Sequence, residues 1–305
     1  MVAGYKHLVV VRVYSEPYMS FNFKRRSILK AGVASLVAGS AGVIFVAPND
    51  IVLKKDNIVK PQYSESAVKD NLEKIKNFDK TFTEDIFLTT EKYSTFQTTL
   101  QRILRVRNLI GFANFNLVSF DDMLLYSHRY PKIGRFTKKE LALIDEIFFY
   151  DANQYGFHGN KVIKELTSKI NKKETIKIAK SGHYLFKGDA LNKFNHLKND
   201  VGPELVLTSG VRSIVKQLQL FLSKLEASNG NLSLASRSLA PPGHSYHGIG
   251  DFDVGKKGFG HFNFTSKFAQ TSEYKRLIEL KYIDLRYTKD NQVGVRYEPW
   301  HIKVV

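Results

Sequence analysis

The chain contains no cysteine among its 305 residues. It therefore has no disulfide to hold a small fold together, no thiolate nucleophile, and no Cys-ligated zinc or iron–sulfur cluster. Its stability has to come from hydrophobic cores, for which the 43% of apolar residues supply the material. Any bound metal ion has to be held by histidines and carboxylates. The length is sufficient for one large domain or two of ordinary size.

The chain is basic, with a net charge of +17, but this charge is spread out. Residues 1–30 hold six basic residues and one acidic residue, and the other 40 basic and 28 acidic residues form no run of five or six like charges. Such a diffuse surface suits several kinds of polyanion and is not the clustered pattern that nucleic-acid recognition needs. Nucleic acid is therefore not an expected partner.

A targeting signal is predicted near the N-terminus. Residues 24–30 (KRRSILK) are basic, and residues 31–47 (AGVASLVAGSAGVIFVA) are small and weakly apolar. This run is shorter than the about 20 apolar residues of a membrane span, which favours a signal segment. The paired arginines resemble the twin-arginine export signal. We therefore expect export to the periplasm or cell envelope by the twin-arginine machinery, with at most a membrane anchor through this segment.

The predicted signal divides the chain into three expected parts. Residues 1–47 form an N-terminal extension and the signal, which has ordinary length if translation starts at Met19 instead of Met1. Residues 48–180 form a mostly helical region without an assigned role. Residues 181–305 form an α+β catalytic domain. Cleavage of the signal and permanent anchoring both remain open.

Helical patterns dominate the middle of the chain. Residues 94–110 show helical periodicity, with Ser94 or Thr95 as the N-cap. The sequence TKKE from Thr137 to Glu140 has the form of a capping box and predicts the start of a second helix. A third helix is expected over residues 160–170. Residues 49–80 are polar and lysine-rich, which indicates a tether or a loosely packed arm. The residues expected on the apolar face of the first helix are Phe96, Leu100, Ile103, Leu104 and Leu109.

From about residue 181 the pattern changes to a mixture of strands and helices. Residues 204–209 (ELVLTS) predict a buried strand, and residues 211–226 an amphipathic helix. A short strand is expected over residues 250–254 and a final strand over residues 293–304. Glycines crowd the segment between the helix and the short strand, where loops on a rigid scaffold often form sites.

Two histidine-containing segments carry the candidate chemistry. They are residues 243–254 (GHSYHGIGDFDV) and 296–302 (RYEPWHI). His247, His301 and one aspartate make a three-ligand set, which in zinc hydrolases leaves one position open for water. Glu298, three residues before His301, supplies a candidate general base.

These segments resemble the zinc D,D-peptidase family that includes the VanX- and VanY-type D-alanyl-D-alanine peptidases. Ser245, His247 and Gly250 match the first family motif, Ser-x-His-x-x-Gly-x-Ala-x-Asp, and residues 298–301 match the second, Glu-Pro-Trp-His. In the family the aspartate follows the histidine by seven residues. Asp253 follows by six and Asp251 by four.

The resemblance implies that His247, His301 and an aspartate bind zinc. We expect Asp253 to be the ligand, because Val254 fits the apolar residue that follows the family's aspartate. A one-residue deletion in the turn then explains the offset. Asp251 is the alternative.

A third segment agrees with the resemblance. Residues 208–217 (TSGVRSIVKQ) are similar to the family's Ser-Gly-Tyr-Arg-Ser-x-x-x-Gln. The similarity implies that Arg212 stabilises the anionic reaction centre or binds the substrate carboxylate. Further candidate substrate-binding residues are Ser213, Gln217, Ser245 and Tyr246. His158, His183 and His261 are expected to be structural.

The resemblance covers residues 180–305 and implies a small antiparallel sheet. It also implies a zinc-dependent D-alanyl-D-alanine carboxypeptidase that acts on peptidoglycan stem peptides, with Glu298 as general base. The same metal chemistry serves an L,D-carboxypeptidase or a peptidoglycan endopeptidase, so these remain alternatives. A metal-free envelope-binding protein on the same fold is another.

Overall fold

The computed structural model describes residues 65–281 and 283–305, which belong to one compact unit. The predicted export signal, the choice of start codon and the segment 1–47 lie outside these residues and stay predictions. None of the helices in the described ranges has the length and apolar composition needed to cross a bilayer.

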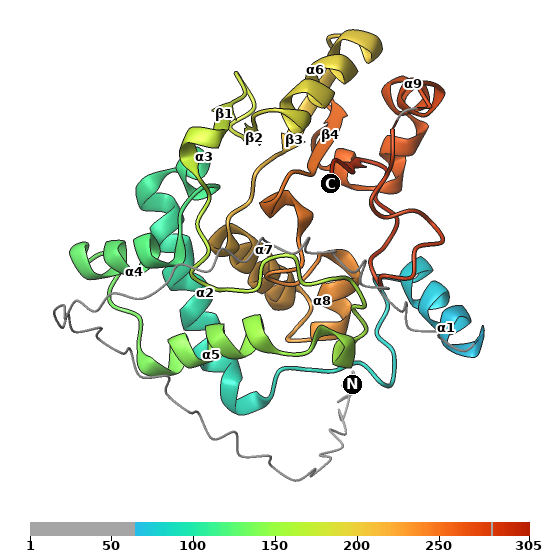
Figure 1. Ribbon diagram of the computed structural model, residues 1–305. Coiled ribbons are helices and arrows are strands. Elements are labelled where there is room, and N and C mark those ends of the chain that lie inside the picture. The colour runs from blue at the N-terminus through green and yellow to red at the C-terminus, as the bar shows by residue number, and fades with distance from the viewer. Residues whose placement is uncertain (1–64, 282) are drawn as a thin grey trace, which may run out of the picture. The chain divides into compact units, whose positions relative to one another are not determined.

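The expected α+β class is confirmed, with helices outweighing two small antiparallel sheets (Figure 1). In the described ranges, the helices are α1 (Glu65–Lys76), α2 (Thr90–Ile110), α3 (Phe112–Phe115), α4 (Phe120–Arg129), α5 (Lys138–Phe149), α6 (Asp189–Val201), α7 (Ile214–Ala227), α8 (Leu232–Ser238) and α9 (Ser272–Glu279). The strands are β1 (Thr175–Lys177), β2 (Tyr184–Phe186), β3 (Leu205–Ser209), β4 (Phe252–Lys256) and β5 (His301–Ile302).

The predicted capping box at the start of α5 is confirmed. The Thr137 hydroxyl accepts a hydrogen bond from the Glu140 backbone N–H, and the Glu140 carboxylate accepts one from the Thr137 N–H. Two of the N–H groups that a helix leaves without partners are thereby satisfied. The N-cap predicted for α2 was wrong: the helix begins at Thr90, so Ser94 and Thr95 lie inside it. Leu109, expected on its apolar face, is exposed.

The helix predicted over residues 160–170 was also wrong. This segment is irregular, because its backbone bonds to a distant loop: the Ile163 N–H donates to the carbonyl of Gly243. The loose arm predicted over residues 49–80 was wrong for its described part, which contains α1. Lys74 on this helix pairs with Asp70 and Glu84.

The largest hydrophobic core joins the middle helices to α7. Side chains of α2, α4 and α5 pack with one face of α7, and α8 contributes to the same core. The α7 residues in this core include Leu218, Phe221 and Leu222, all fully buried. A helix of the predicted catalytic part thus shares its core with the predicted helical region, and the boundary at residue 180 stays a prediction.

A three-stranded antiparallel sheet in the order β3-β4-β5 forms the base of a second core. Helix α6 contacts β3 and lies beside the sheet (Figure 1). Strands β3 and β4 match the predicted strands within two residues. The final strand is much shorter than predicted, only His301–Ile302, because residues 299 and 300 form a turn. Pro299 cannot donate a ladder hydrogen bond, which is consistent with this interruption.

Candidate metal centre

The register of the sheet lines up three polar side chains from three adjacent strands. Asp253 on β4 pairs with Ser209 on β3 and with His301 on β5. Directly paired residues of an antiparallel sheet lie on the same face. Phe252 and Ile302, the strand neighbours of Asp253 and His301, belong to the hydrophobic core. The row of Ser209, Asp253 and His301 therefore faces away from that core.

A bulge in β3 is needed for this arrangement. The register shifts between Leu207, which pairs with Val254, and Ser209, which pairs with Asp253. Thr208 is the extra residue. Because side chains alternate along a strand, the inserted residue moves Ser209 from the core-facing to the site-facing side.

His247 reaches the same place from a 3₁₀ turn, Tyr246–Gly248. Its Nδ1 lies 2.9 Å from the carbonyl oxygen of Gly210, and its own carbonyl accepts a hydrogen bond from the Arg212 N–H. Only glycine fits at position 210, since a Cβ there would lie 2.0 Å from the Tyr184 carbonyl oxygen. The ring is held with Nδ1 toward the backbone and Nε2 toward Asp253.

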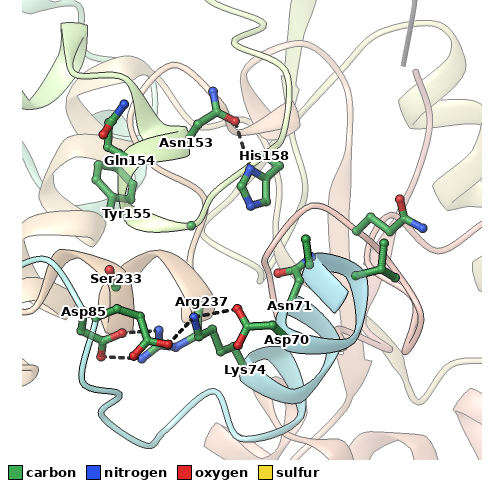
Figure 2. Close-up of a pocket in the computed structure, with 15 residues that line it drawn as sticks. Asp70, Asn71, Lys74, Asp85, Asn153, Gln154, Tyr155, His158, Ser233 and Arg237 are labelled. Carbon is green, nitrogen blue, oxygen red and sulfur yellow. Dashed lines mark hydrogen bonds and ion pairs between the residues drawn. The ribbon is translucent and has the colours of Figure 1, made fainter. Parts of the chain in front are cut away.

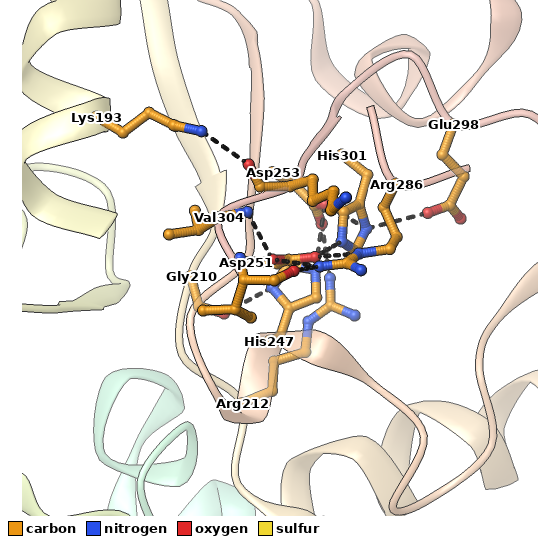
Figure 3. Close-up of polar contacts among 12 residues, drawn as sticks. Lys193, Gly210, Arg212, His247, Asp251, Asp253, Arg286, Glu298, His301 and Val304 are labelled. Carbon is orange, nitrogen blue, oxygen red and sulfur yellow. Dashed lines mark hydrogen bonds and ion pairs between the residues drawn. The ribbon is translucent and has the colours of Figure 1, made fainter. Parts of the chain in front are cut away.

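Ligand atoms of His247, Asp253 and His301 converge within 4.8 Å of one another (Figure 3). The Oδ1 atom of Asp253 is 3.2 Å from Nε2 of His247 and 3.4 Å from Nδ1 of His301. All three residues are buried, yet the His247 Nε2 and Asp253 Oδ1 atoms form no hydrogen bond within the described residues. Two imidazole nitrogens and one carboxylate oxygen suit a catalytic zinc ion.

The other aspartate, Asp251, has a different environment. Its carboxylate accepts two hydrogen bonds from Arg286, at 2.7 and 3.1 Å, and one from the Val304 N–H at 2.8 Å. Its Oδ2 is also 3.1 Å from Nε2 of His301. When His301 carries its proton on Nε2, Nδ1 offers a lone pair toward Asp253. This geometry favours Asp253 over Asp251 as a metal ligand.

The charges around the centre favour the metal-binding protonation states of His247 and Asp253. Burial, and then the Arg212 guanidinium, lower the pKa of His247, which keeps the imidazole neutral. Burial raises the pKa of Asp253, but positive charge on His247, when it is protonated, and on the Arg212 guanidinium outweighs burial and holds that pKa well below its usual range. The Arg212 Nη2 donates to Asp253 Oδ2 at 2.6 Å, and its Nε donates to Ser209 Oγ.

Glu298 lies beside the centre, with Oε2 3.3 Å from Nδ1 of His301 (Figure 3). Burial lowers the pKa of His301, but its contacts with Asp251 and Glu298 raise it, to about 9 overall. Three carboxylates, of Asp251, Asp253 and Glu298, thus surround this ring and stabilise positive charge on it.

A cavity of ≈ 390 Å³ opens onto the centre, and several buried polar atoms of its lining residues lack hydrogen-bond partners among the described residues. Nine buried side-chain polar atoms lack a hydrogen-bond partner among the described residues, and seven of them belong to residues that line this cavity. Buried polar groups are normally paired, so their concentration around one cavity indicates a binding site. The seven residues are His183, Thr208, Gln217, Ser238, His247, Asp253 and Arg296.

A second cavity, ≈ 340 Å³ and lined partly by α1, shows the opposite pattern (Figure 2). Arg237 donates to both carboxylate oxygens of Asp85, at 2.7 and 2.9 Å, and Lys74 pairs with Asp70. Its charged groups are largely paired with one another, which is typical of a structural ion-pair cluster.

The four residues predicted to bind substrate divide into two pairs. Gln217 and Ser245 line the cavity, and Gln217 donates through Nε2 to the Ala240 carbonyl. Ser213 is the N-cap of α7, its hydroxyl accepting from the Lys216 N–H. Tyr246 stacks on the Arg286 guanidinium, 3.6 Å from the ring centroid, and is not among the cavity-lining residues.

Sequence reasoning missed several residues around the site. Tyr287 lines the cavity and contacts the His301 ring edge-on, and Arg286 binds Asp251. His183 and Arg296 line the cavity, and His183 Nδ1 and Arg296 Nε have no hydrogen-bond partner among the described residues, although His183 was expected to be structural only. Arg296 and Tyr297 precede the Glu-Pro-Trp-His motif directly, which was the available signal for Arg296. Nothing local in the sequence marks His183 or Arg286.

The chain is similar in part to solved structures of peptidases. The LdcB LD-carboxypeptidase is 25% identical with a TM-score of 0.35, and the match covers 43% of this chain and 63% of that chain. A VanY D,D-pentapeptidase variant in complex with Zn(II) is 20% identical with a TM-score of 0.34, covering 43% and 78%. The chain thus spans less than two thirds of the length of LdcB. The search of curated proteins found no match.

A family model gives the most specific comparison. Residues 187–305, which contain the candidate metal centre and all three motifs, match the model of the VanY family, described as D-alanyl-D-alanine carboxypeptidase.

Proposed function

We propose that this protein is a zinc-dependent peptidase that removes the terminal D-alanine from peptidoglycan stem peptides ending in D-alanyl-D-alanine. One observation carries the proposal: buried ligand atoms of His247 and Asp253, which form no hydrogen bond within the described residues, converge with Nδ1 of His301 beside the Glu298 carboxylate. The match of residues 187–305 to the VanY family supports the substrate class.

His247, Asp253 and His301 would hold the zinc ion. When bound, zinc supplies a Lewis acid for the scissile carbonyl and lowers the pKa of a water molecule. The chain orients each ligand by a second contact. The Gly210 carbonyl accepts a hydrogen bond from Nδ1 of His247, and Arg212 donates to Oδ2 of Asp253. The Asp251 carboxylate accepts a hydrogen bond from Nε2 of His301.

Glu298 would act as the general base. Its carboxylate takes a proton from the attacking water and passes it to the nitrogen of the leaving D-alanine. Arg212 would stabilise the negative charge that develops on the carbonyl oxygen, because its guanidinium lines the cavity while fixing Asp253. Gln217 and Ser245 would contact the peptide, whereas Ser213 and Tyr246 would support the site through α7 and Arg286.

The substrate class places the proposed reaction in the cell envelope. Export by the twin-arginine route and catalysis by residues 181–305, with residues 48–180 as a preceding helical region, complete the proposal. The basic surface suits an anionic cell wall.

The test measures zinc content and D-alanine release on the purified full-length protein. We expect one zinc per chain, and loss of this zinc in His247→Ala. Glu298→Gln is expected to keep the zinc while D-alanine release from a stem pentapeptide falls by about 10²–10⁴-fold, the usual contribution of a general base. His196→Ala and Glu279→Gln, at exposed positions, are the matched controls.

Each alternative gives a different result. Release from a tetrapeptide but not from a pentapeptide would indicate an L,D-carboxypeptidase, and cleavage within cross-linked stems an endopeptidase. A folded wild-type protein that binds no zinc and releases no D-alanine would overturn the proposal in favour of a metal-free envelope-binding protein.

A further inference from the structure

Lys216 is a third cation of the cavity, in addition to Arg212 and Arg296. It lies in the first turn of α7 and lines the same cavity as the candidate metal centre. Only 6% of its surface is exposed, which is rare for a lysine without a carboxylate partner. None of the motifs in the sequence assigns it a role.

The contacts of Lys216 leave its charge uncompensated. Its Nζ donates to the side-chain oxygen of Gln219 at 3.2 Å and lies 5.0 Å from the ring centroid of Phe112. No carboxylate of the described residues forms an ion pair with it. Burial, and then the cations Arg212 and Arg107, lower the pKa of Lys216 to about 8.

The position of Lys216 in the helix adds to the free-energy cost of its buried charge. A helix N-terminus carries partial positive charge, so a lysine in the first turn is less favourable there than an acidic residue. The first turn of α7 has no acidic residue. Burial, a neighbouring guanidinium and the helix dipole therefore all disfavour the ammonium ion. The guanidinium and the helix dipole would favour an anion beside it in the cavity, and such an anion would compensate the buried ammonium charge.

We propose that Lys216 binds a carboxylate of the peptide substrate, at the wall of the cavity that Phe112 of α3 helps to form. This inference rests on the proposed function. It also gives the helical region before residue 180 a part in the site, because Phe112 belongs to that region and lines the cavity. The carboxylate is either the C-terminal one of the leaving residue or a side-chain carboxylate of the stem.

The experiment uses calorimetric binding to the full-length Glu298→Gln variant, in which turnover is slowed. Three stem pentapeptides are compared: the free acid, its C-terminal amide, and a form with the side-chain carboxylates amidated. We expect the free acid to bind about 30-fold more tightly than one of the two amidated peptides, which identifies the carboxylate. Adding Lys216→Met should remove that preference, and Lys216→Arg should retain it.

Lys224→Met, on the same helix but outside the cavity, is the control and should leave all three affinities unchanged. In the absence of peptide, Lys216→Met should not lower the melting temperature, because it removes an unpaired buried charge. Equal weakening of all three peptides by Lys216→Met, or no change in any, would overturn the role of Lys216 alone. If the wild-type protein binds neither zinc nor any peptide, both this inference and the proposed function fail.

Discussion

Two different environments meet at α7. Toward α2, α4 and α5 the helix presents fully buried apolar side chains such as Phe221 and Leu218. Toward the cavity it presents Lys216 and Gln217. The helical core pairs its buried charge: Glu140 accepts hydrogen bonds from Arg102 at 3.1 and 3.2 Å and completes a capping box.

The cavity shows the reverse: seven buried polar atoms of its lining residues have no hydrogen-bond partner in the part of the chain that the structure describes. An open buried polar atom costs free energy that the rest of the fold has to offset. One helix thus contributes to both the shared hydrophobic core and the wall of the cavity, on separate faces. Variants on the two faces should therefore separate stability from metal and ligand binding.

The largest effect is expected on the helical face. Phe221→Ala should lower the free energy of unfolding by about 3–5 kcal/mol, because it empties a fully buried ring position in the shared core. Urea denaturation measures this loss. Phe149→Ala removes a ring that is 60% exposed and should change stability by less than about 0.5 kcal/mol. Comparable stability of the two variants would contradict the assignment of α7 to that core.

A smaller effect is expected behind the metal centre. Asp251→Asn should weaken zinc binding by about 10–100-fold, because the side chain that receives the His301 Nε2 proton and binds Arg286 loses its charge. Competition with a chelator measures the affinity, with exposed Asp290→Asn as the control. Complete loss of zinc instead would indicate that Asp251, not Asp253, is the ligand.

The smallest effect is expected at the start of α5. Thr137→Ala removes the hydroxyl of the capping box and should cost about 1 kcal/mol of stability while zinc affinity stays unchanged. Thr98→Ala, at an exposed position inside α2, removes a hydroxyl without a capping role and should not lower stability. A change in zinc affinity in Thr137→Ala would show that the two faces of α7 are coupled.

Local chemistry explains which features could be predicted from sequence. The capping box needs only four consecutive residues, and the strand at Leu205–Ser209 is a short apolar run. The structure brings together the motif residues His247, Asp253, Glu298 and His301. They could be predicted because each motif is a short segment of the sequence.

Long-range contacts explain the failures. Residues 160–170 have a helical pattern, but the bond from Ile163 to the Gly243 carbonyl spans 80 residues of sequence. Arg286 and Asp251 are 35 residues apart, and no spacing rule connects them. The bulge at Thr208 became visible only from the pairing of β3 with β4.

The bulge also has a consequence for how this chain can tolerate insertions and deletions. The row of Ser209, Asp253 and His301 depends on strand register, so adding one residue inside β4, between Phe252 and Asp253, would turn the aspartate toward the side of Phe252 and the core if Phe252 keeps its pairing. Adding two residues would restore the side but move the carboxylate along the strand by about 6–7 Å, beyond the reach of both histidines. Changes of length inside this strand are therefore compatible with a metal site only when a bulge absorbs them, as at Thr208, or when another strand changes register with it.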